Sequence, residues 1–308
     1  MESGAEWVAV DWGTSNLRAW GIAPDGEIAF ARSSDRGMGK LAPDAFPDVL
    51  TELLAADVDT AGTRIDVVIC GMAGARQGWM EAPYIEAPAD LGGLAYGAVR
   101  PPMPRSRLEP RILPGVCQKL GGAEDVMRGE ETQLLGLGSL TPGFSGVVVL
   151  PGTHSKWVEL SGRRIERFST SMTGEIYEVL RTHSVLRLSM GGDLDGPERD
   201  VGFTAGLDTG IEAPQQLTAM LFKVRASALL SGRGPAWCAG YLSGLLIGTE
   251  IGGQRGWLGA GQAEVPLIGS ATLCALYAKG LARLDIKTRI VDATAATLAG
   301  LKLARALA

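Results

Sequence analysis

The chain has 308 residues, of which 46% are hydrophobic and 20% are charged, and its formal net charge at pH 7 is −5. This length is enough for two domains, and the hydrophobic fraction is enough for a sizeable core. The pI of about 5.3, with no evident basic stripe, argues against nucleic acid or an anionic membrane surface as a partner.

Cysteine usage and the first residues bear on the compartment. The four cysteines, Cys70, Cys117, Cys238 and Cys274, lie far apart and form no CxxC pair. We therefore expect no zinc site and a reduced, cytoplasmic protein. The opening Met-Glu-Ser-Gly-Ala-Glu is acidic and unlike a signal peptide. No apolar run approaches the ~18 residues of a membrane span.

The first half of the chain alternates strands and helices. Apolar runs predict strands near 7–12, 17–23 and 26–31, a helix over 44–56 and a buried strand over 66–71. The segment Met72–Asp90 has the glycines and prolines of a loop, and the Pro-rich residues 101–110 are predicted to form a connecting loop. A further strand is predicted over 111–117, and a helix from Glu130 to about Gly138.

The second half repeats the opening pattern. Val147–Leu150 is predicted as a buried strand, the polar segment Pro151–Lys156 as a turn, and Trp157–Leu160 as the strand that follows. A helix follows Ala239, and a strand over 265–270 precedes an apolar helix over 271–284. The chain ends with a strand over 288–292 and a helix over 293–307, which is rich in alanine and leucine.

Two hairpins about 140 residues apart therefore carry Gly-Thr turns. In the first, Gly13 allows close backbone approach, and Thr14, Ser15 and Asn16 offer donors to phosphate oxygens. Asp11 at the end of the strand is a suitable oxygen ligand for Mg²⁺. Either hairpin alone is also explained as an ordinary polar turn. Two of them facing each other across a cleft could hold a polyphosphate from both sides, which favours nucleotide binding.

This arrangement resembles the sugar kinase/actin/Hsp70 superfamily. Within it, nearly the whole chain resembles the 2-dehydro-3-deoxygalactonokinase family. The strings that carry the resemblance are Val10–Trp20, Cys70–Trp79, Asp125–Gln133, Leu150–Trp157 and Tyr241–Gly248. The resemblance implies an α/β fold of two ribonuclease H-like (actin-like ATPase) domains with a cleft between them. We expect domains over 1–138 and 139–308, with the last helix packing back on the first domain.

The resemblance also implies an activity, the ATP-dependent phosphorylation of the terminal C6 hydroxyl of 2-dehydro-3-deoxy-D-galactonate in galactonate breakdown. ATP and Mg²⁺ are the implied cofactors, and Asp11 is the implied metal residue, directly or through water. The superfamily places an Asp base where the first connecting helix begins, whereas this chain has Glu130 and Glu131 there. Spacing within the superfamily favours Glu131, with Glu130 in reserve. Acids in a first helical turn also stabilise the helix without any catalytic role.

The remaining predicted site residues divide into two groups. A keto-acid substrate favours an arginine clamp, for which Arg76 and Arg128 are the candidates, with Gly74 and Gln77 in the same loop as Arg76. Arg18 is the alternative that fixes the first hairpin. The predicted nucleotide residues of the second half are Gly152, Thr153, His154, Ser155, Lys156, Gly269 and Ser270. We predict that Trp79 and Trp157 are packing residues. For Thr173-Gly174-Glu175, a cleft lining and a helix N-cap explain the sequence equally well.

Two other functions stay open from the sequence. One is a superfamily kinase for another sugar or sugar acid, such as 2-dehydro-3-deoxygluconate, and the other is an actin-like or Hsp70-like switch ATPase. A dinucleotide enzyme is excluded because no GxGxxG follows the first strand. The expected partners are ATP and a small sugar acid, with neither nucleic acid nor membrane, and a homodimer is left open.

Overall fold

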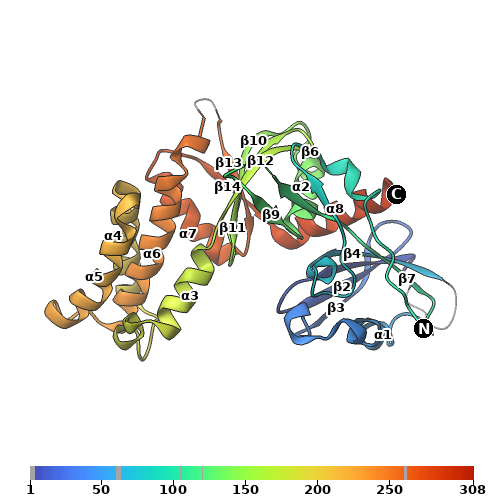
Figure 1. The fold of residues 1–308 in the computed structure, drawn as a ribbon, viewed down its shortest axis with the longest axis horizontal. Helices are drawn as coiled ribbons and strands as arrows, with labels where there is room; N and C mark the ends of the chain where they lie inside the picture. Colours follow the sequence, from blue (N-terminus) through green and yellow to red (C-terminus); the bar gives the residue numbers. More distant parts are fainter. Residues whose placement is uncertain (1–3, 60–63, 105, 120, 260–261) are drawn as a thin grey trace. The chain divides into compact units, whose positions relative to one another are not determined.

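The computed structural model describes residues 4–59, 64–104, 106–119, 121–259 and 262–308. It divides into two compact units (Figure 1). The first unit contains Met1–Ser145, Leu160–Arg167 and Ala293–Ala308, and the second contains Gly146–Glu159 and Phe168–Asp292. The C-terminal helix thus belongs to the same unit as the N-terminal strands.

The first unit is built on a five-stranded sheet with the order β3-β2-β1-β4-β7. Strand β1 pairs antiparallel with β2 and parallel with β4, and β7 adds parallel to β4. The apolar run of β1 is buried along nearly its whole length, as expected for a central strand covered on both faces. The strands are β1 (Trp7–Trp12), β2 (Leu17–Ile22), β3 (Ile28–Ser34), β4 (Ile65–Gly71) and β7 (Leu108–Ile112).

Aromatic side chains fill the core beside this sheet. Trp12 packs against Phe46 of α1 (Phe46–Leu54) with ring centroids 4.7 Å apart, and Phe46 stacks on Trp79 at 6.0 Å. This confirms the prediction that Trp79 is a packing residue, and the fully buried Trp157 confirms the same prediction for the second unit.

The second sheet has the order β14-β13-β10-β11-β12, which repeats the first when strands are numbered within each unit. Strand β6 (Ala89–Asp90) adds to β12 at Arg164 and Ile165. A smaller sheet, β5-β8-β9, belongs to the first unit. The remaining strands are β5 (Tyr84–Glu86), β8 (Gly115–Gln118), β9 (Asp125–Met127), β10 (Ser145–Leu150), β11 (Ser155–Ser161), β12 (Arg164–Ser171), β13 (Val265–Gly269) and β14 (Thr288–Asp292).

Glycines let one pair of helices in each unit pack backbone to backbone. In the first unit, a Cβ at Gly136 of α2 (Glu130–Leu140) would lie 1.9 Å from the carbonyl oxygen of Ala296 in α8 (Ala293–Ala306). In the second unit, a Cβ at Gly206 of α4 (Pro197–Glu212) would lie 2.1 Å from the carbonyl oxygen of Tyr241 in α6 (Pro235–Gly253). Any side chain at these contacts would force the helices apart.

Three sequence expectations need correction. The Pro-rich stretch does not remain a loop to residue 110, because β7 begins at Leu108. Pro110 is tolerated there since β7 is at the edge of its sheet and the missing N–H breaks no essential ladder. The strand predicted over 111–117 is two strands, β7 and β8, which belong to different sheets.

The third correction concerns residues 173–230, where a helix start at Thr173 was one of two explanations and no further helix was predicted. This region contains α3 (Thr173–His183), α4 and α5 (Leu217–Leu230). Outside it, α7 (Ala271–Ala282) follows β13 as expected. Figure 1 shows α4, α5 and α6 packed side by side. Among the described residues, no helix combines the length and apolar character that crossing a membrane requires.

Candidate active site

The first polar turn joins β1 and β2 and is held by its own backbone. The amide of Gly13 donates to the carbonyl of Asn16 at 2.9 Å. Thr14, Ser15 and Asn16 are exposed, so their donors are available to a ligand. Gly37 lies directly behind the turn, where a Cβ would come within 2.3 Å of the backbone of Ser15.

Asp11 lies at the carboxyl end of β1, one residue before the strand ends. Its Oδ2 accepts from Nη2 of Arg18 at 2.5 Å, and Nη1 of the same arginine donates to Thr294 of α8 at 3.2 Å. Arg18 therefore links the first hairpin to the C-terminal helix, in agreement with its predicted role of fixing the hairpin. The side chain of Asp11 is 18% exposed, so a ligand can reach it.

Glu131 lies in the first turn of α2 and is 1% exposed. Its two carboxylate oxygens accept from the amide of Gly129 at 2.9 and 2.7 Å, and Thr132 donates to Oε1 at 3.1 Å. Burial, followed by the nearby charge of Glu130, raises the pKa of Glu131 to about 8. A carboxyl group with such a pKa exchanges its proton near neutral pH, which suits acid–base work.

The ends of β1 and β4 and the start of α2 bring Asp11 and Glu131 together around Cys70. Cys70 is directly opposite Asp11 in the sheet register, and its Sγ lies 4.0 Å from Oδ1 of Asp11. Burial, then the charges of Asp11 and Glu131, raise the pKa of the Cys70 thiol well above its usual value. Gly129, with φ +109, lets α2 begin close to Gly71 at the end of β4.

Glu130 and Arg128 flank this cluster. A carboxylate oxygen of Glu130 accepts from the backbone amide of Arg128 at 3.1 Å. The guanidinium of Arg128 lies over the ring of Tyr84, 4.4 Å from its centroid, and Nη2 donates to the carbonyl of Ala82 at 2.9 Å. Within the described residues its buried Nε and Nη1 find no hydrogen-bond partner. These donors make Arg128 the better placed of the two predicted arginines for holding an anion.

The loop that follows β4 carries the other predicted substrate residues. Arg76 and Gln77 are exposed at the tip of this loop. Gly74 is buried in the 3-10 turn Met72–Gly74, and a Cβ there would lie 2.8 Å from Nη1 of Arg128. Gly74 is therefore needed for the position of Arg128.

The second polar turn, after β10, packs against the start of α3. The amide of Glu175 donates to the carbonyl of Thr153 at 3.1 Å, and a Cβ at Gly174 would lie 2.7 Å from the carbonyl oxygen of Gly152. His154 is exposed at the turn, with Nε2 at 2.5 Å from Oε2 of Glu175.

The structure places Ser155 and Lys156 in β11 and not in the turn. Both side chains are buried. The Ser155 hydroxyl is 2.7 Å from the Tyr277 hydroxyl, and Nζ of Lys156 donates to Thr170 at 2.8 Å.

A cavity of about 180 Å³ lies in the second unit beside this turn. Gly152 and Gly174 line it, together with the hydroxyl-bearing side chains of Thr173 and Tyr277. The apolar part of its wall comes from Leu246, Ile247, Leu273 and Leu276. Gly269 and Ser270 do not line the cavity. They lie next to it, because a Cβ at Gly269 would be 2.9 Å from the carbonyl oxygen of Pro151, and Ser270 caps α7, whose Leu273 forms part of the wall.

Glu250, which was not among the residues predicted from the sequence, is central to this part of the second unit. It lies in α6, is 6% exposed, and accepts from Trp157, Thr173 and Tyr277. A lone acid inside the apolar helix 241–251 was the signal that could have identified it. Thr173 is the first residue of α3 and not its N-cap, since its hydroxyl goes to Glu250.

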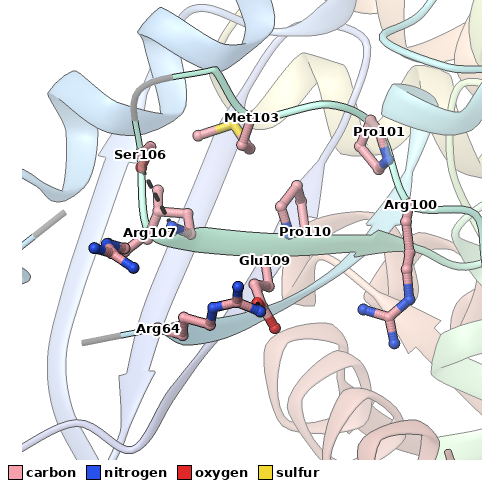
Figure 2. Close-up of a pocket in the computed structure, with 9 residues that line it drawn as sticks. Arg64, Arg100, Pro101, Met103, Ser106, Arg107, Glu109 and Pro110 are labelled. Atoms are coloured by element: carbon pink, nitrogen blue, oxygen red, sulfur yellow. Dashed lines mark hydrogen bonds and ion pairs between the residues drawn. The ribbon is translucent and has the colours of Figure 1, made fainter. Parts of the chain in front are cut away.

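A larger cavity, of about 630 Å³, lies elsewhere in the first unit (Figure 2). It is bounded by β7 and the preceding segment, with Arg64, Arg100 and Arg107 at its rim, and Arg64 pairs with Glu109 at 2.6 Å. Leu108 of this cavity pairs with Ile65 at the amino end of β4. It is therefore at the opposite end of the sheet from Asp11, and none of the predicted site residues lines it.

Comparison with known proteins identifies the family of this chain. Residues 11–304 match the family model described as 2-keto-3-deoxy-galactonokinase. The chain is 42% identical to a Rhizobium meliloti protein named probable 2-dehydro-3-deoxygalactonokinase, over 99% of this chain and 98% of that protein. It is 35% identical to the 2-dehydro-3-deoxygalactonokinase of Escherichia coli, over 97% of each.

Solved structures show the same fold. A crystal structure of a candidate 2-dehydro-3-deoxygalactonokinase from Sinorhizobium meliloti superposes with a TM-score of 0.88 at 43% identity and 97% coverage of both chains. The (R)-2-hydroxyglutaryl-CoA dehydratase component A of Acidaminococcus fermentans shares only the fold, at a TM-score of 0.51 and 11% identity, over 98% of both chains. The expected actin-like ATPase fold is confirmed, and the chain belongs to the 2-keto-3-deoxy-galactonokinase family of sugar-acid kinases.

Proposed function

We propose that this chain uses ATP to phosphorylate the terminal C6 hydroxyl of 2-dehydro-3-deoxy-D-galactonate. Membership of the kinase family supports the substrate and the reaction class. The observation that carries the proposal is the juxtaposition of Asp11 and Glu131 around Cys70, where two strands end and α2 begins. Ligands of α/β sheets bind at the carboxyl ends of the strands, which is where these acids lie.

In the proposed step, the substrate hydroxyl oxygen attacks the γ-phosphorus of ATP. A bond forms between these atoms, the bond from the γ-phosphorus to the bridging oxygen breaks, and ADP leaves. Glu131 takes the hydroxyl proton as general base. Its pKa of about 8 places this proton transfer near physiological pH.

Asp11 is the residue that would hold Mg²⁺. Mg²⁺ in kinases is bound through one or two carboxylates together with water and substrate phosphates, and a single partly exposed carboxylate fits that donor set. Arg18, which donates to Oδ2, would hold the Asp11 carboxylate in place for the metal or its water shell. When bound, the ion neutralises phosphate charge.

The two polar turns would bind phosphate. In the first turn the exposed Thr14, Ser15 and Asn16 supply donors. In the second turn Gly152, Thr153 and His154 remain the proposed residues, while the buried Ser155 and Lys156 would act by holding the strand that follows. Gly269 and Ser270 are proposed to lie beside the nucleoside, next to the cavity of the second unit.

The carboxylate of the sugar acid needs a cation. We assign Arg128 this role because two of its donors are buried without a partner in the described part of the chain. Arg76 and Gln77, exposed on the neighbouring loop, are proposed to contact the sugar-acid chain. Since ATP is the phosphoryl donor and all four cysteines are free, we also propose a cytoplasmic location.

The test is an ADP-release assay with three acceptors and a blank. We expect turnover with 2-dehydro-3-deoxygalactonate, weaker turnover with its epimer 2-dehydro-3-deoxygluconate, and none with a neutral hexose. ATP hydrolysis of equal rate without any acceptor would instead identify a switch ATPase. Equal rates with the neutral hexose would remove the proposed role of Arg128.

A further inference from the structure

We propose that Glu250 is a positioning residue for the nucleotide, holding the first residue of α3 against the second polar turn and thereby fixing the wall of the 180 Å³ cavity. The inference rests on the proposed use of ATP and adds a residue to which no role had been assigned. It depends only on contacts within the second unit.

Three donors satisfy the buried Glu250 carboxylate. Oε1 accepts from Nε1 of Trp157 at 2.8 Å, and Oε2 accepts from the hydroxyl of Tyr277 at 2.7 Å. Oε2 also accepts a short hydrogen bond from the hydroxyl of Thr173. Burying a carboxylate is costly unless donors satisfy it, so these three contacts are what make Glu250 tolerable inside α6.

The three donors come from three separate elements. Trp157 lies in β11, Thr173 begins α3, and Tyr277 lies in α7. With Glu250 itself in α6, one carboxylate ties together four elements that are separate in sequence. A network in which every member is satisfied gives the surrounding structure a single arrangement.

The network also reaches the cavity proposed for the nucleotide. Thr173 and Tyr277 both line the cavity, together with Gly152 of the polar turn. The residues directly after Thr173 contact the turn, since Glu175 donates its amide to Thr153 and Gly174 lies against Gly152. Glu250 itself does not line the cavity, so it acts through Thr173 and Tyr277.

The alternative is that Glu250 only stabilises the unit. A residue of general structural importance would weaken both substrates or neither. A positioning residue at this place weakens nucleotide binding and leaves the sugar acid unaffected, because every contact of the network is made in the second unit.

The experiment measures the Kd of ADP with Mg²⁺ by titration calorimetry, and the KM of the sugar acid at saturating ATP. Glu250→Gln keeps the size of the side chain but replaces one acceptor oxygen by a donor. We expect the Kd of ADP to rise about tenfold, the typical effect of losing a hydrogen bond to a charged group, with an unchanged KM for the sugar acid. Glu264→Gln is the matched control, since Glu264 is a half-exposed acid of the same unit that pairs with Arg289.

If Glu250→Gln does not fold, a second pair of variants tests the hydrogen bond between Thr173 and Glu250 from the other side. Thr173→Val removes the hydroxyl that donates to Glu250, whereas Thr173→Ser keeps it. We expect ADP binding to be clearly weaker in Thr173→Val than in Thr173→Ser. Equal effects of Val and Ser, wild-type ADP affinity in both Glu250→Gln and Thr173→Val, or a parallel rise of the sugar-acid KM would each overturn the proposal. ADP binding is measured without the sugar acid, so a wrong acceptor assignment leaves this test intact.

Discussion

The two sheets have the same strand order but place different chemistry at the turn that follows their first strand. In the first unit, two acids and an arginine gather there, namely Asp11, Glu131 and Arg18. In the second unit, hydroxyl groups of Ser155, Thr173 and Tyr277 surround a single carboxylate that is fully satisfied. One architecture thus carries a cluster of charged side chains in one copy and a closed hydrogen-bond network around a single carboxylate in the other.

This difference separates chemistry from binding. Charges that face reacting atoms act on the rate, while satisfied networks set the shape of a binding surface. We therefore expect changes in the first unit to lower kcat and changes around Glu250 to lower nucleotide affinity. The following predictions test that division, beginning with the largest effect.

Glu131→Gln should lower kcat by roughly 10²–10⁴-fold, the contribution of a positioned base, while the Kd of ADP stays near the wild-type value. Steady-state rates and calorimetry measure the two quantities. Glu130→Gln is the control, because its carboxylate accepts from the backbone of Arg128 and its charge at the helix start is worth about 0.3–1 kcal/mol. Reversed phenotypes would make Glu130 the base, and two active variants would exclude both.

Asp11→Asn should lower kcat on the order of 10²-fold by removing a charge that is needed in the transition state. The fold should survive, because the amide replaces the carboxylate at nearly the same size. Rates are measured over a series of Mg²⁺ concentrations, with circular dichroism as the folding control. Wild-type turnover at saturating Mg²⁺ would remove Asp11 from the mechanism.

The rate should also depend on pH through Glu131. Its pKa is raised to about 8, so the charged form that acts as base is the minor form at pH 6 and becomes the major form above pH 8. We expect kcat/KM to rise by roughly tenfold per pH unit below the pKa and then to level off. The profile is recorded between pH 5.5 and about 9, and a rate that is flat over this range would contradict the assignment.

Gly136→Ala should destabilise the first unit by about 1–3 kcal/mol, as overpacking does, because the new methyl group would meet the backbone of Ala296. Gly138→Ala, two residues away in the same helix, meets only a side-chain atom of Arg163 at 3.8 Å. This control should be neutral, or more stable by about 0.5–1 kcal/mol. Thermal unfolding compares the two, and equal melting temperatures would contradict the backbone contact between α2 and α8.

Much of this molecule could be predicted from local patterns. The strands around Asp11 and Gly152 have clear apolar runs that end in Gly-Thr turns, and their positions agree with the structure to within a few residues. The helix 293–306 was also evident, because alanine and leucine favour helix so strongly.

What the sequence could not provide depends on contacts between distant residues. In the sequence, Ser155 and Lys156 look like turn residues. In the fold both are buried, and the Ser155 hydroxyl is hydrogen-bonded to Tyr277 while Lys156 donates to Thr170. Glu250 had no local partner that would reveal its role, since its three donors lie 27 to 93 residues away. Helix α4 was missed because three glycines interrupt its apolar pattern, although glycine is what α4 needs against α6.

The membership of α8 in the first unit has a consequence for how the chain acquires its structure during synthesis. This helix packs on α2 and contacts β1 and β4, and its Thr294 holds Arg18. The ribosome makes this helix after all of the second unit. The N-terminal strands therefore keep one face uncovered until the second unit has been synthesised, whereas the second unit has all its residues before α8 emerges. Nascent chains that stop short of residue 293 should depend most strongly on chaperones that bind exposed apolar segments.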